Sequence, residues 1–196
     1  MQEQTHEKQR LTADLRQALA RRQLEVYYQP IIDLPSGKIV KAEALLRWHH
    51  PEMGQISPEI FIPVAEDSGL LHQIGHWVFR QAISFIEQCR QRHNRLIQIS
   101  VNKSPIQFEK DIYDDWPQYL SQTGLPGDSI TVEITEGSLL SKSPKIKQRL
   151  LDYINFGIEV SIDDFGTGFS ALSYLHQFDI DYLKIDRSFI MDLSEN

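Results

Sequence analysis

The sequence is poor in cysteine, poor in basic residues and free of long hydrophobic runs. A single cysteine, Cys89, excludes a disulfide bond within the chain and is typical of a reducing compartment. The 27 acidic residues outnumber the 20 Lys and Arg residues, so the formal net charge is -7. Proteins bind nucleic-acid polymers mainly by neutralising phosphates, and this charge balance therefore argues against DNA or RNA as a partner.

No apolar run approaches the roughly 20 residues that a membrane-spanning helix needs, and residues 1–23 are too polar for a signal peptide. We therefore expect no membrane span in this chain and a cytoplasmic location. The 196 residues are 41% hydrophobic and 24% charged, which predicts one globular domain with a sizeable core. So acidic a chain needs bound metal ions to hold a phosphate-bearing ligand.

The first part of the chain predicts a helix followed by two paired strands. We expect residues 1–23 to form a linker with a short helix over 12–22, capped by Thr12. Two runs rich in β-forming residues, 25–32 and 39–48, are joined by the short turn Pro35-Ser36-Gly37-Lys38. This connection makes the pair antiparallel, because a parallel crossover needs a dozen or more residues.

The rest of the sequence predicts an alternation of helices and strands. A helix begins at Ser57-Pro58 and a second, amphipathic helix covers about 70–92. Further strands are expected at 96–102, 130–136, 158–164 and 182–185, with helical stretches near 105–123, 144–156 and 170–177.

This order predicts an α/β fold, namely a TIM-like (β/α)8 barrel with an antiparallel first strand pair. A doubly wound sheet is disfavoured because no glycine-rich phosphate loop follows the first strand. The sequence holds six predicted strands where a closed barrel has eight. We therefore expect a barrel truncated after strand six, with residues 24–196 forming a domain that is incomplete at its C-terminus.

Polar residues interrupt or end five of the apolar runs. They are Glu43, Asn102, Glu133, the pair Asp163-Asp164, and Lys184. Strand ends converge at one end of a barrel, where carboxylate and amide oxygens can surround a divalent cation. Two adjacent aspartates also repel one another, and a cation beside them is the simplest compensation.

Each of these residues alone has a structural alternative. Glu43 and Lys184 could form ion pairs with core residues of opposite charge, and Asn102 could cap a turn or helix. The segment from Asp163 to Gly166 could be an aspartate-capped turn. All of the alternatives would have to hold at the same end of successive strands, so the set as a whole favours a functional site.

Seven segments of the chain resemble motifs of the EAL family of bacterial cyclic di-GMP phosphodiesterases. They occur in the family's order from about Leu24 to the C-terminus: Tyr28-Gln29-Pro30-Ile31, Glu43-Ala44-Leu45-Leu46-Arg47-Trp48, Phe61-Ile62-Pro63-Val64-Ala65-Glu66, Asn102-Lys103-Ser104, Glu133-Ile134-Thr135-Glu136, Asp163 to Ser170, and Leu183-Lys184-Ile185-Asp186.

The resemblance implies a site with two ions of Mg²⁺ or Mn²⁺, with Ca²⁺ inhibitory. One ion is expected on Glu43, Asn102, Glu133 and Asp163, and the second is shared by Asp163 and Asp164. The implied reaction opens one phosphodiester of cyclic di-GMP and releases linear pGpG.

The resemblance also assigns roles to further residues. Lys184 is expected to hold or polarise the attacking water, Arg47 to contact a phosphate, and Gln29 and Asp164 to contact the ligand. Glu136 corresponds to the glutamate that anchors the loop from Asp163 to Ser170, which the family also uses at its dimer interface. A homodimer and an upstream sensory or cyclase domain are therefore expected partners, and the chain could be the cytosolic part of a larger membrane-bound sensor.

Three functional interpretations remain open. The family's pattern continues with a seventh-strand glutamate and an eighth-strand glutamine, and neither is in these residues, so the alternative to a phosphodiesterase is a catalytically inactive regulatory module that binds cyclic di-GMP. A glycoside hydrolase that uses Glu43 and Glu133 is the third interpretation. It predicts metal independence and leaves Asp163-Asp164 and Lys184 without a role.

Overall fold

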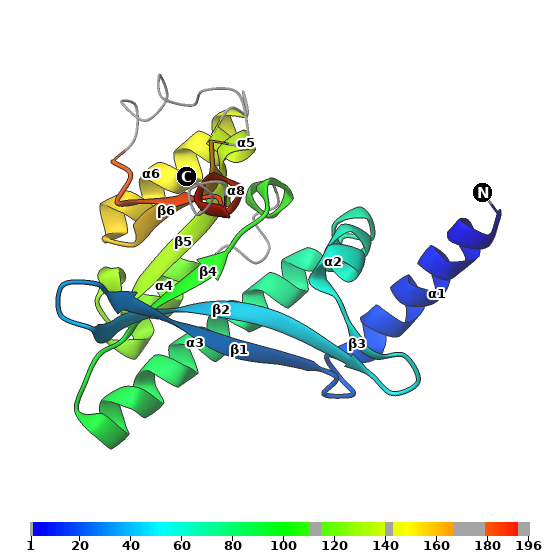
Figure 1. Ribbon diagram of the computed structural model, residues 1–196, viewed down its shortest axis with the longest axis horizontal. Coiled ribbons are helices and arrows are strands. Elements are labelled where there is room, and N and C mark those ends of the chain that lie inside the picture. Colours follow the sequence, from blue (N-terminus) through cyan, green and yellow to red (C-terminus); the bar gives the residue numbers. More distant parts are fainter. Residues whose placement is uncertain (1, 110–114, 140–142, 167–178, 192–196) are drawn as a thin grey trace.

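The computed structural model describes residues 2–109, 115–139, 143–166 and 179–191. In this part of the chain a seven-stranded mixed sheet carries helices on its outer side (Figure 1). The strand order is β1-β2-β4-β5-β6-β7, and β3 pairs with β2 outside this path. The strands are β1 (Leu24–Asp33), β2 (Lys38–His50), β3 (Gly54–Ile56), β4 (Gln98–Asn102), β5 (Ile130–Thr135), β6 (Glu159–Phe165) and β7 (Tyr182–Ile185).

The topology confirms the predicted α/β class. β1 and β2 are antiparallel, whereas β2, β4, β5, β6 and β7 follow one another in parallel. Within the described residues the sheet is not closed, and β1 and β7 form its edges. The count of six strands is wrong by one, because Gly54–Ile56 turns back along the end of β2 and adds the short strand β3.

Most predicted helices lie where the apolar periodicity placed them. The helical elements are α1 (Gln2–Ala18), α2 (Pro58–Asp67), α3 (Leu71–His93), η1 (Pro105–Phe108), α4 (Trp116–Thr123), η3 (Gly127–Ser129), α5 (Glu136–Leu139), α6 (Pro144–Phe156) and α8 (Ser188–Met191). The stretch expected at 170–177 lies outside the described residues. Within the described part, none of the helices combines the length and apolar character needed to cross a bilayer.

Helix α1 differs from its prediction. It begins at Gln2 rather than near residue 12, and Thr12 is no cap, because its hydroxyl donates to the carbonyl of Lys8 one turn earlier within the helix. The apolar face of α1 buries Leu11, Leu15 and Ala18 in the same core as the sheet and the other helices. The polar first turns carry no apolar periodicity, which is why the sequence pattern located only the packed half of this helix.

The two faces of the sheet have opposite chemistry. On β2 the buried Ala42 and Ala44 belong to the hydrophobic core, and they alternate with Lys41 and Glu43. The same alternation places Val132 and Ile134 of β5 in the core and leaves Thr131, Glu133 and Thr135 on the other face. The helices therefore cover an apolar outer face, and the inner, concave face is lined with polar side chains.

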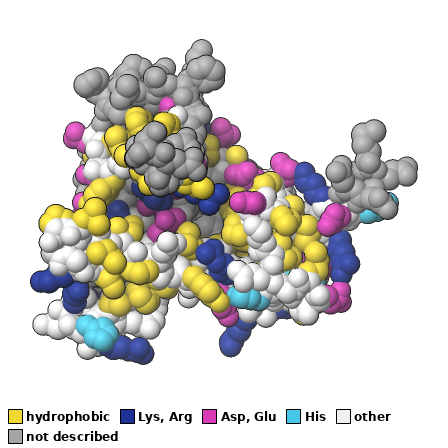
Figure 2. Space-filling view, in the orientation of Figure 1, with side chains coloured by type: hydrophobic (Ala, Val, Ile, Leu, Met, Phe, Trp, Pro, Cys, Tyr) yellow, Lys and Arg dark blue, Asp and Glu magenta, His cyan; other side chains and the backbone are white. Residues whose placement is uncertain are grey.

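Aromatic rings fill the layer between the sheet and its helices. Trp48 of β2 meets Phe61 of α2 edge to face at 5.6 Å, and Phe79 of α3 stacks on Trp116 of α4 at 4.3 Å. All four rings are almost completely buried. Apolar side chains also remain exposed on the face that Figure 2 shows, and Leu34, in the turn of the β1–β2 hairpin, is 91% exposed.

Gly127, just before β5, packs closely against the backbone at the end of α6. A Cβ atom on Gly127 would lie 2.5 to 2.7 Å from backbone atoms of Phe156 and Gly157, whereas a Cβ on Gly137 would meet nothing within 4 Å. Backbone atoms cannot yield as a flexible side chain can, so we expect Gly127→Ala to lower the free energy of unfolding by about 1–3 kcal/mol. Urea denaturation measures this loss, with Gly137→Ala as the matched control. Equal stability of the two variants would contradict the close approach.

Candidate active site

Three carboxylates and one ammonium group meet on the concave face. The Nζ atom of Lys184 lies 3.1 Å from Glu43 Oε2, 2.7 Å from Glu133 Oε2 and 3.0 Å from Asp163 Oδ2. The Glu133 side chain is only 1% exposed, and those of Glu43 and Asp163 are 16% and 24% exposed. The four residues come from strands β2, β5, β6 and β7, so curvature of the sheet brings β7 across to β2.

Strand register places these groups at one level. Asn102, the last residue of β4, lies opposite Glu133 of β5, and its Nδ2 donates to Glu43 Oε1 at 2.8 Å. The pairing of β6 with β7 shifts between Ile162 and Phe165, so that the two aspartates form a bulge opposite Lys184. A bulge redirects side chains at a strand end, and here it turns Asp163 toward the ammonium.

Asp164 occupies the strained position of this bulge. Its φ angle is +53°, which a residue other than glycine rarely adopts, and its amide donates to Asp163 Oδ1 at 3.0 Å. Partial burial, with the charges of Asp163 and Asp186, raises the pKa of Asp164 above its ordinary value. A nearby cation would relieve this repulsion between carboxylates.

Charge balance in the cluster favours a bound cation. Burial and the neighbouring Glu43 raise the pKa of Glu133. Burial lowers the pKa of Lys184, but hydrogen bonds and charges from Glu133, Glu43 and Asp163 outweigh it, and its pKa rises well above the usual value. With all groups ionised, three carboxylates face one ammonium, so negative charge remains in excess.

The three carboxylates also fit a metal ion geometrically. One oxygen from each of Glu43, Glu133 and Asp163 lies within 4.8 Å of the others. Oxygen-only ligand sets suit hard cations such as Mg²⁺ and Mn²⁺. The described residues thus assemble a group that can hold a metal ion.

Glu136 lies next to the site and holds the end of the bulged segment. It is 4% exposed at the start of α5, and its Oε2 accepts a hydrogen bond from the amide of Gly166 at 3.1 Å. The remainder of the expected loop, residues 167–170, falls outside the described part of the chain.

Gln29 and Arg47 share the face of β1 and β2 that carries Glu43. Gln29 pairs with Glu43 across the two strands, and Arg47 follows Glu43 by four residues. The guanidinium of Arg47 donates to the carbonyl of Leu46 at 2.9 Å and lies 5.6 Å from the centre of the Tyr27 ring. The register thus puts Gln29 opposite Glu43, whereas Arg47 lies four residues further along β2.

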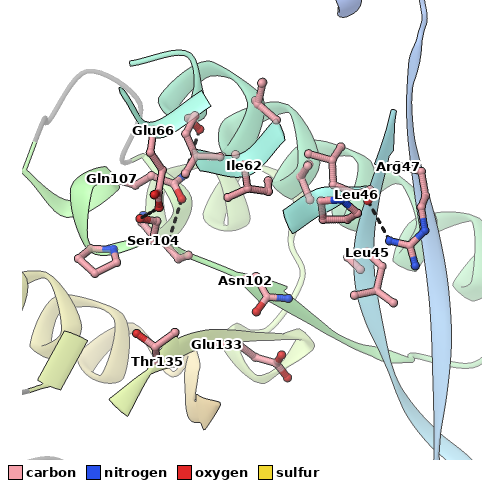
Figure 3. Close-up of a pocket in the computed structure, with 18 residues that line it drawn as sticks. Leu45, Leu46, Arg47, Ile62, Glu66, Asn102, Ser104, Gln107, Glu133 and Thr135 are labelled. Carbon is pink, nitrogen blue, oxygen red and sulfur yellow. Dashed lines mark hydrogen bonds between the residues drawn. The ribbon is translucent and has the colours of Figure 1, made fainter. Parts of the chain in front are cut away.

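A cavity of about 440 Å³ adjoins the cluster between β2, α2, α3 and the end of β4. In Figure 3 Asn102 and Glu133 lie along one side of it, Glu66, Ser104 and Gln107 gather at one end, and Arg47 lies toward the other. Its wall is largely apolar, with contributions from Leu46, Ile62, Leu71, Ile74 and Val78. Such cavities, with a few fixed polar groups, are the usual form of small-molecule sites.

Sequence reasoning missed a second polar layer deeper in the sheet. Lys41 is 7% exposed, and its ammonium donates to Thr131 Oγ1 at 2.7 Å and lies 3.9 Å from the centre of the Tyr182 ring. Glu159 accepts a hydrogen bond from Gln98 in the same layer. The available signal was the spacing of Lys41 two residues before Glu43, which puts both side chains on one face of β2.

An α/β sheet with convergent carboxylates at the ends of parallel strands is typical of barrel-like domains, whose active sites lie at that end. The EAL domain family profile matches residues 12–196, and the chain belongs to this family. The match begins within α1, upstream of the boundary at residue 24 that the motifs suggested.

Similar proteins support this assignment. The chain is 38% identical over 181 residues to the cyclic di-GMP phosphodiesterase NbdA of Pseudomonas aeruginosa, covering 92% of this chain and 23% of that protein. It is 39% identical over 203 residues to the bifunctional diguanylate cyclase/cyclic di-GMP phosphodiesterase MucR of the same species, covering 100% of this chain and 29% of that protein. The chain thus spans less than a third of the length of either relative.

A solved structure agrees with the fold. The PaMucR phosphodiesterase in complex with c-di-GMP superposes with a TM-score of 0.85 at 39% sequence identity, over 95% of this chain and 76% of that one.

The buried Lys41 predicts a specific pH dependence of stability. Burial lowers the pKa of Lys41 from 10.5 to about 8, while Glu133 and Glu159 partly oppose this shift. Between these two values the unfolded chain binds more protons at Lys41 than the folded chain, so this residue makes stability rise with pH. The contribution is at most about 3 kcal/mol, at about 1.4 kcal/mol per pKa unit.

We therefore expect the free energy of unfolding of the unmodified chain, relative to Lys41→Met, to increase by about 1–3 kcal/mol from about pH 8 to pH 10. Urea denaturation at a series of pH values measures this difference, and the titration of other groups cancels in it. A difference that does not change with pH would show that Lys41 keeps an ordinary pKa.

Proposed function

We propose that this chain is a metal-dependent phosphodiesterase domain that hydrolyses cyclic di-GMP to linear pGpG. The observation that carries the proposal is the convergence of Glu43, Glu133 and Asp163 on the Lys184 ammonium, with distances of 2.7 to 3.1 Å, in a chain of the EAL family. The names of the relatives NbdA and MucR support the choice of substrate.

The metal ligands that we propose are Glu43, Asn102, Glu133, Asp163 and Asp164, for two ions of Mg²⁺ or Mn²⁺. When bound, such ions offset the charge of a phosphate and lower the pKa of a coordinated water. Asn102 already contacts Glu43, and the excess negative charge of the three carboxylates favours cation binding. The Lys184 ammonium lies where the carboxylates converge, so a cation must compete with it.

The reaction adds one water molecule across a phosphodiester. A bond forms between the water oxygen and phosphorus, the bond from phosphorus to the 3′ oxygen breaks, and the 3′ oxygen gains a proton. Lys184 holds the attacking water, because its ammonium can donate several hydrogen bonds beside the carboxylates. Arg47 contacts a phosphate, and Gln29 and Asp164 contact the ligand at the same face of the sheet.

The cavity beside Asn102 and Glu133 has the size and lining for part of the dinucleotide. Its apolar wall suits the faces of a purine base, and Glu66 supplies an acceptor for base N–H groups at one end (Figure 3). Glu136 holds the amide of Gly166, and in this proposal that contact keeps the preceding Asp163 and Asp164 in place.

The proposal extends to partners and location. We propose a homodimer in the bacterial cytosol that is regulated by an upstream sensory or cyclase domain. The support is that relatives such as MucR are several times longer than the region they share with this chain and combine phosphodiesterase and cyclase functions by name.

One observation favours a second candidate function. Lys184 contacts all three carboxylates at once and therefore competes with a cation for them. A site in which the ammonium keeps this place would hold ligand without metal-driven turnover. The second candidate is therefore a catalytically inactive module that binds cyclic di-GMP and acts as a receptor.

Hydrolysis is tested with the purified chain and cyclic di-GMP in Mg²⁺ or Mn²⁺, with products resolved by ion-exchange chromatography. We expect pGpG, and we expect Glu43→Ala to reduce its formation by more than about 100-fold, because even changes that act through a metal ligand typically cost 10–100-fold. Chelation of the metal or replacement by Ca²⁺ should also stop the reaction. Binding without product would favour the receptor, and product formation that survives chelation would exclude the metal mechanism.

Lys184 provides a test that separates metal binding from turnover. Lys184→Met removes the ammonium that competes with a cation, so we expect Mn²⁺ affinity, measured by calorimetry, to rise roughly tenfold or more. Turnover should fall by about 10²-fold, because a water that Lys184 no longer holds loses the geometry that attack on phosphorus needs. Lys38→Met, at the exposed start of β2, is the control and should change neither value. Unchanged Mn²⁺ affinity in Lys184→Met would show that the metal binds elsewhere.

A further inference from the structure

Lys103 places a buried ammonium group in a cage of aromatic rings. The residue is 5% exposed, and its Nζ lies 4.4 Å from the ring centre of Trp116 and 4.9 Å from those of Phe108 and Tyr153. The ammonium also donates to the hydroxyl of Tyr153. These contacts come from three separate elements, η1, α4 and α6, all of which lie outside the sheet.

The rings of the cage pack against one another and against α3. Trp116 stacks on Tyr153 with ring centres 5.6 Å apart and on Phe79 of α3 at 4.3 Å. A buried ammonium is costly unless its surroundings replace water, and cation–π contacts are strongest where the cation is desolvated. The position of Lys103 is therefore determined by several groups at once.

The backbone of Lys103 lies at the level of the carboxylate cluster. Its amide donates to the carbonyl of Glu133 at 2.8 Å, one residue beyond the last strand pair, Asn102 with Glu133. Neighbouring residues of an extended chain point to opposite sides. The Asn102 side chain accordingly reaches Glu43 on the concave face, while Lys103 reaches the aromatic cage behind the sheet.

Ser104, the next residue, anchors the same segment to α2 and η1. Ser104 donates through its hydroxyl to Glu66 of α2 at 2.6 Å, and its amide donates to the side chain of Gln107 at 2.9 Å. Asn102 thus precedes two residues that are anchored to different helices. Of the two, Lys103 is adjacent to Asn102 and is the one bonded to the backbone of Glu133.

We propose that Lys103 is a positioning residue for the metal site: its caged ammonium holds the end of β4 so that the Asn102 amide faces Glu43 and Glu133. This inference rests on the proposed function, in which Asn102 is a metal ligand. Lys103 touches neither metal nor substrate, and it acts through the backbone between the cage and Asn102.

The test measures Mn²⁺ binding to the full chain by calorimetry, without substrate, in a double-mutant cycle. Lys103→Met keeps an unbranched apolar chain and removes the ammonium, and we expect it to weaken Mn²⁺ binding about tenfold, at the lower end of the range for groups that orient metal ligands. Asn102→Ala should weaken binding at least as much. Because Lys103 acts through Asn102, the double variant should bind Mn²⁺ as Asn102→Ala does.

The control is Lys145→Met, which removes an exposed ammonium that donates to the carbonyl of Glu109 at 3.2 Å. It should leave Mn²⁺ affinity unchanged. Additive losses in the double variant, or full affinity in Lys103→Met, would overturn the inference and leave the proposed function intact. Unchanged affinity in Asn102→Ala would overturn the inference and remove Asn102 from the proposed ligands, whereas the proposed function is tested separately by the product assay with Glu43→Ala.

A second variant keeps the test valid if Lys103→Met does not fold. Tyr153→Phe retains the ring and removes only the hydroxyl that accepts the Lys103 hydrogen bond, and we expect about a threefold loss of Mn²⁺ affinity, a weaker version of the same effect. The tryptophan fluorescence of the protein should shift in both variants, since the ammonium lies 4.4 Å from the ring of Trp116, one of its three tryptophans. Full Mn²⁺ affinity in a folded Tyr153→Phe protein would contradict the proposal.

Discussion

The contact of Lys184 with three carboxylates is the interaction on which the concave face of this protein depends. Glu133 is almost completely buried at 1% exposure, and a buried carboxylate is tolerated only with a partner of opposite charge. The partner comes from β7, whereas Glu43 comes from β2 on the far side of three intervening strands. The sheet must therefore curve until its strand ends meet, and the helices on its outer face must allow that curvature.

Apolar side chains pack the curved sheet against the helices on its outer face. On its inner face, charged groups pair in two layers, one around Lys184 and one around Lys41. Below the Lys184 cluster, Lys41 bonds to Thr131 and lies over the ring of Tyr182, so a second ammonium compensates acidic groups deeper in the sheet. Behind the sheet, Lys103 sits among aromatic rings at the level of Asn102. Two of these lysines lie on the concave face, and the backbone of the third, Lys103, is hydrogen-bonded to the strand that carries Glu133.

The same arrangement connects structure to chemistry. Three carboxylates facing one ammonium leave negative charge uncompensated, and the bulge at Asp163-Asp164 adds a further carboxylate with a raised pKa. A centre of this kind stabilises the fold less well than a neutral one would, and it attracts divalent cations. The chain belongs to the EAL family and resembles the PaMucR phosphodiesterase structure, and both findings agree with a site that can hold a metal ion.

The sequence by itself determined the order of strands, the antiparallel first pair, the helix Pro144–Phe156 and the strand Tyr182–Ile185, because apolar periodicity and turn residues act locally. It also singled out the strand-end residues now found in contact, although each had a structural alternative. Only the tertiary structure decided that Lys184 faces Glu43, that Lys41 and Lys103 are buried, and that Gly54–Ile56 adds a strand. The contacts of the three lysines depend on the curvature of the sheet and on residues far apart in the chain, which no local pattern encodes. The strand Gly54–Ile56 pairs with the nearby end of β2, and it is too short for a periodic pattern to reveal.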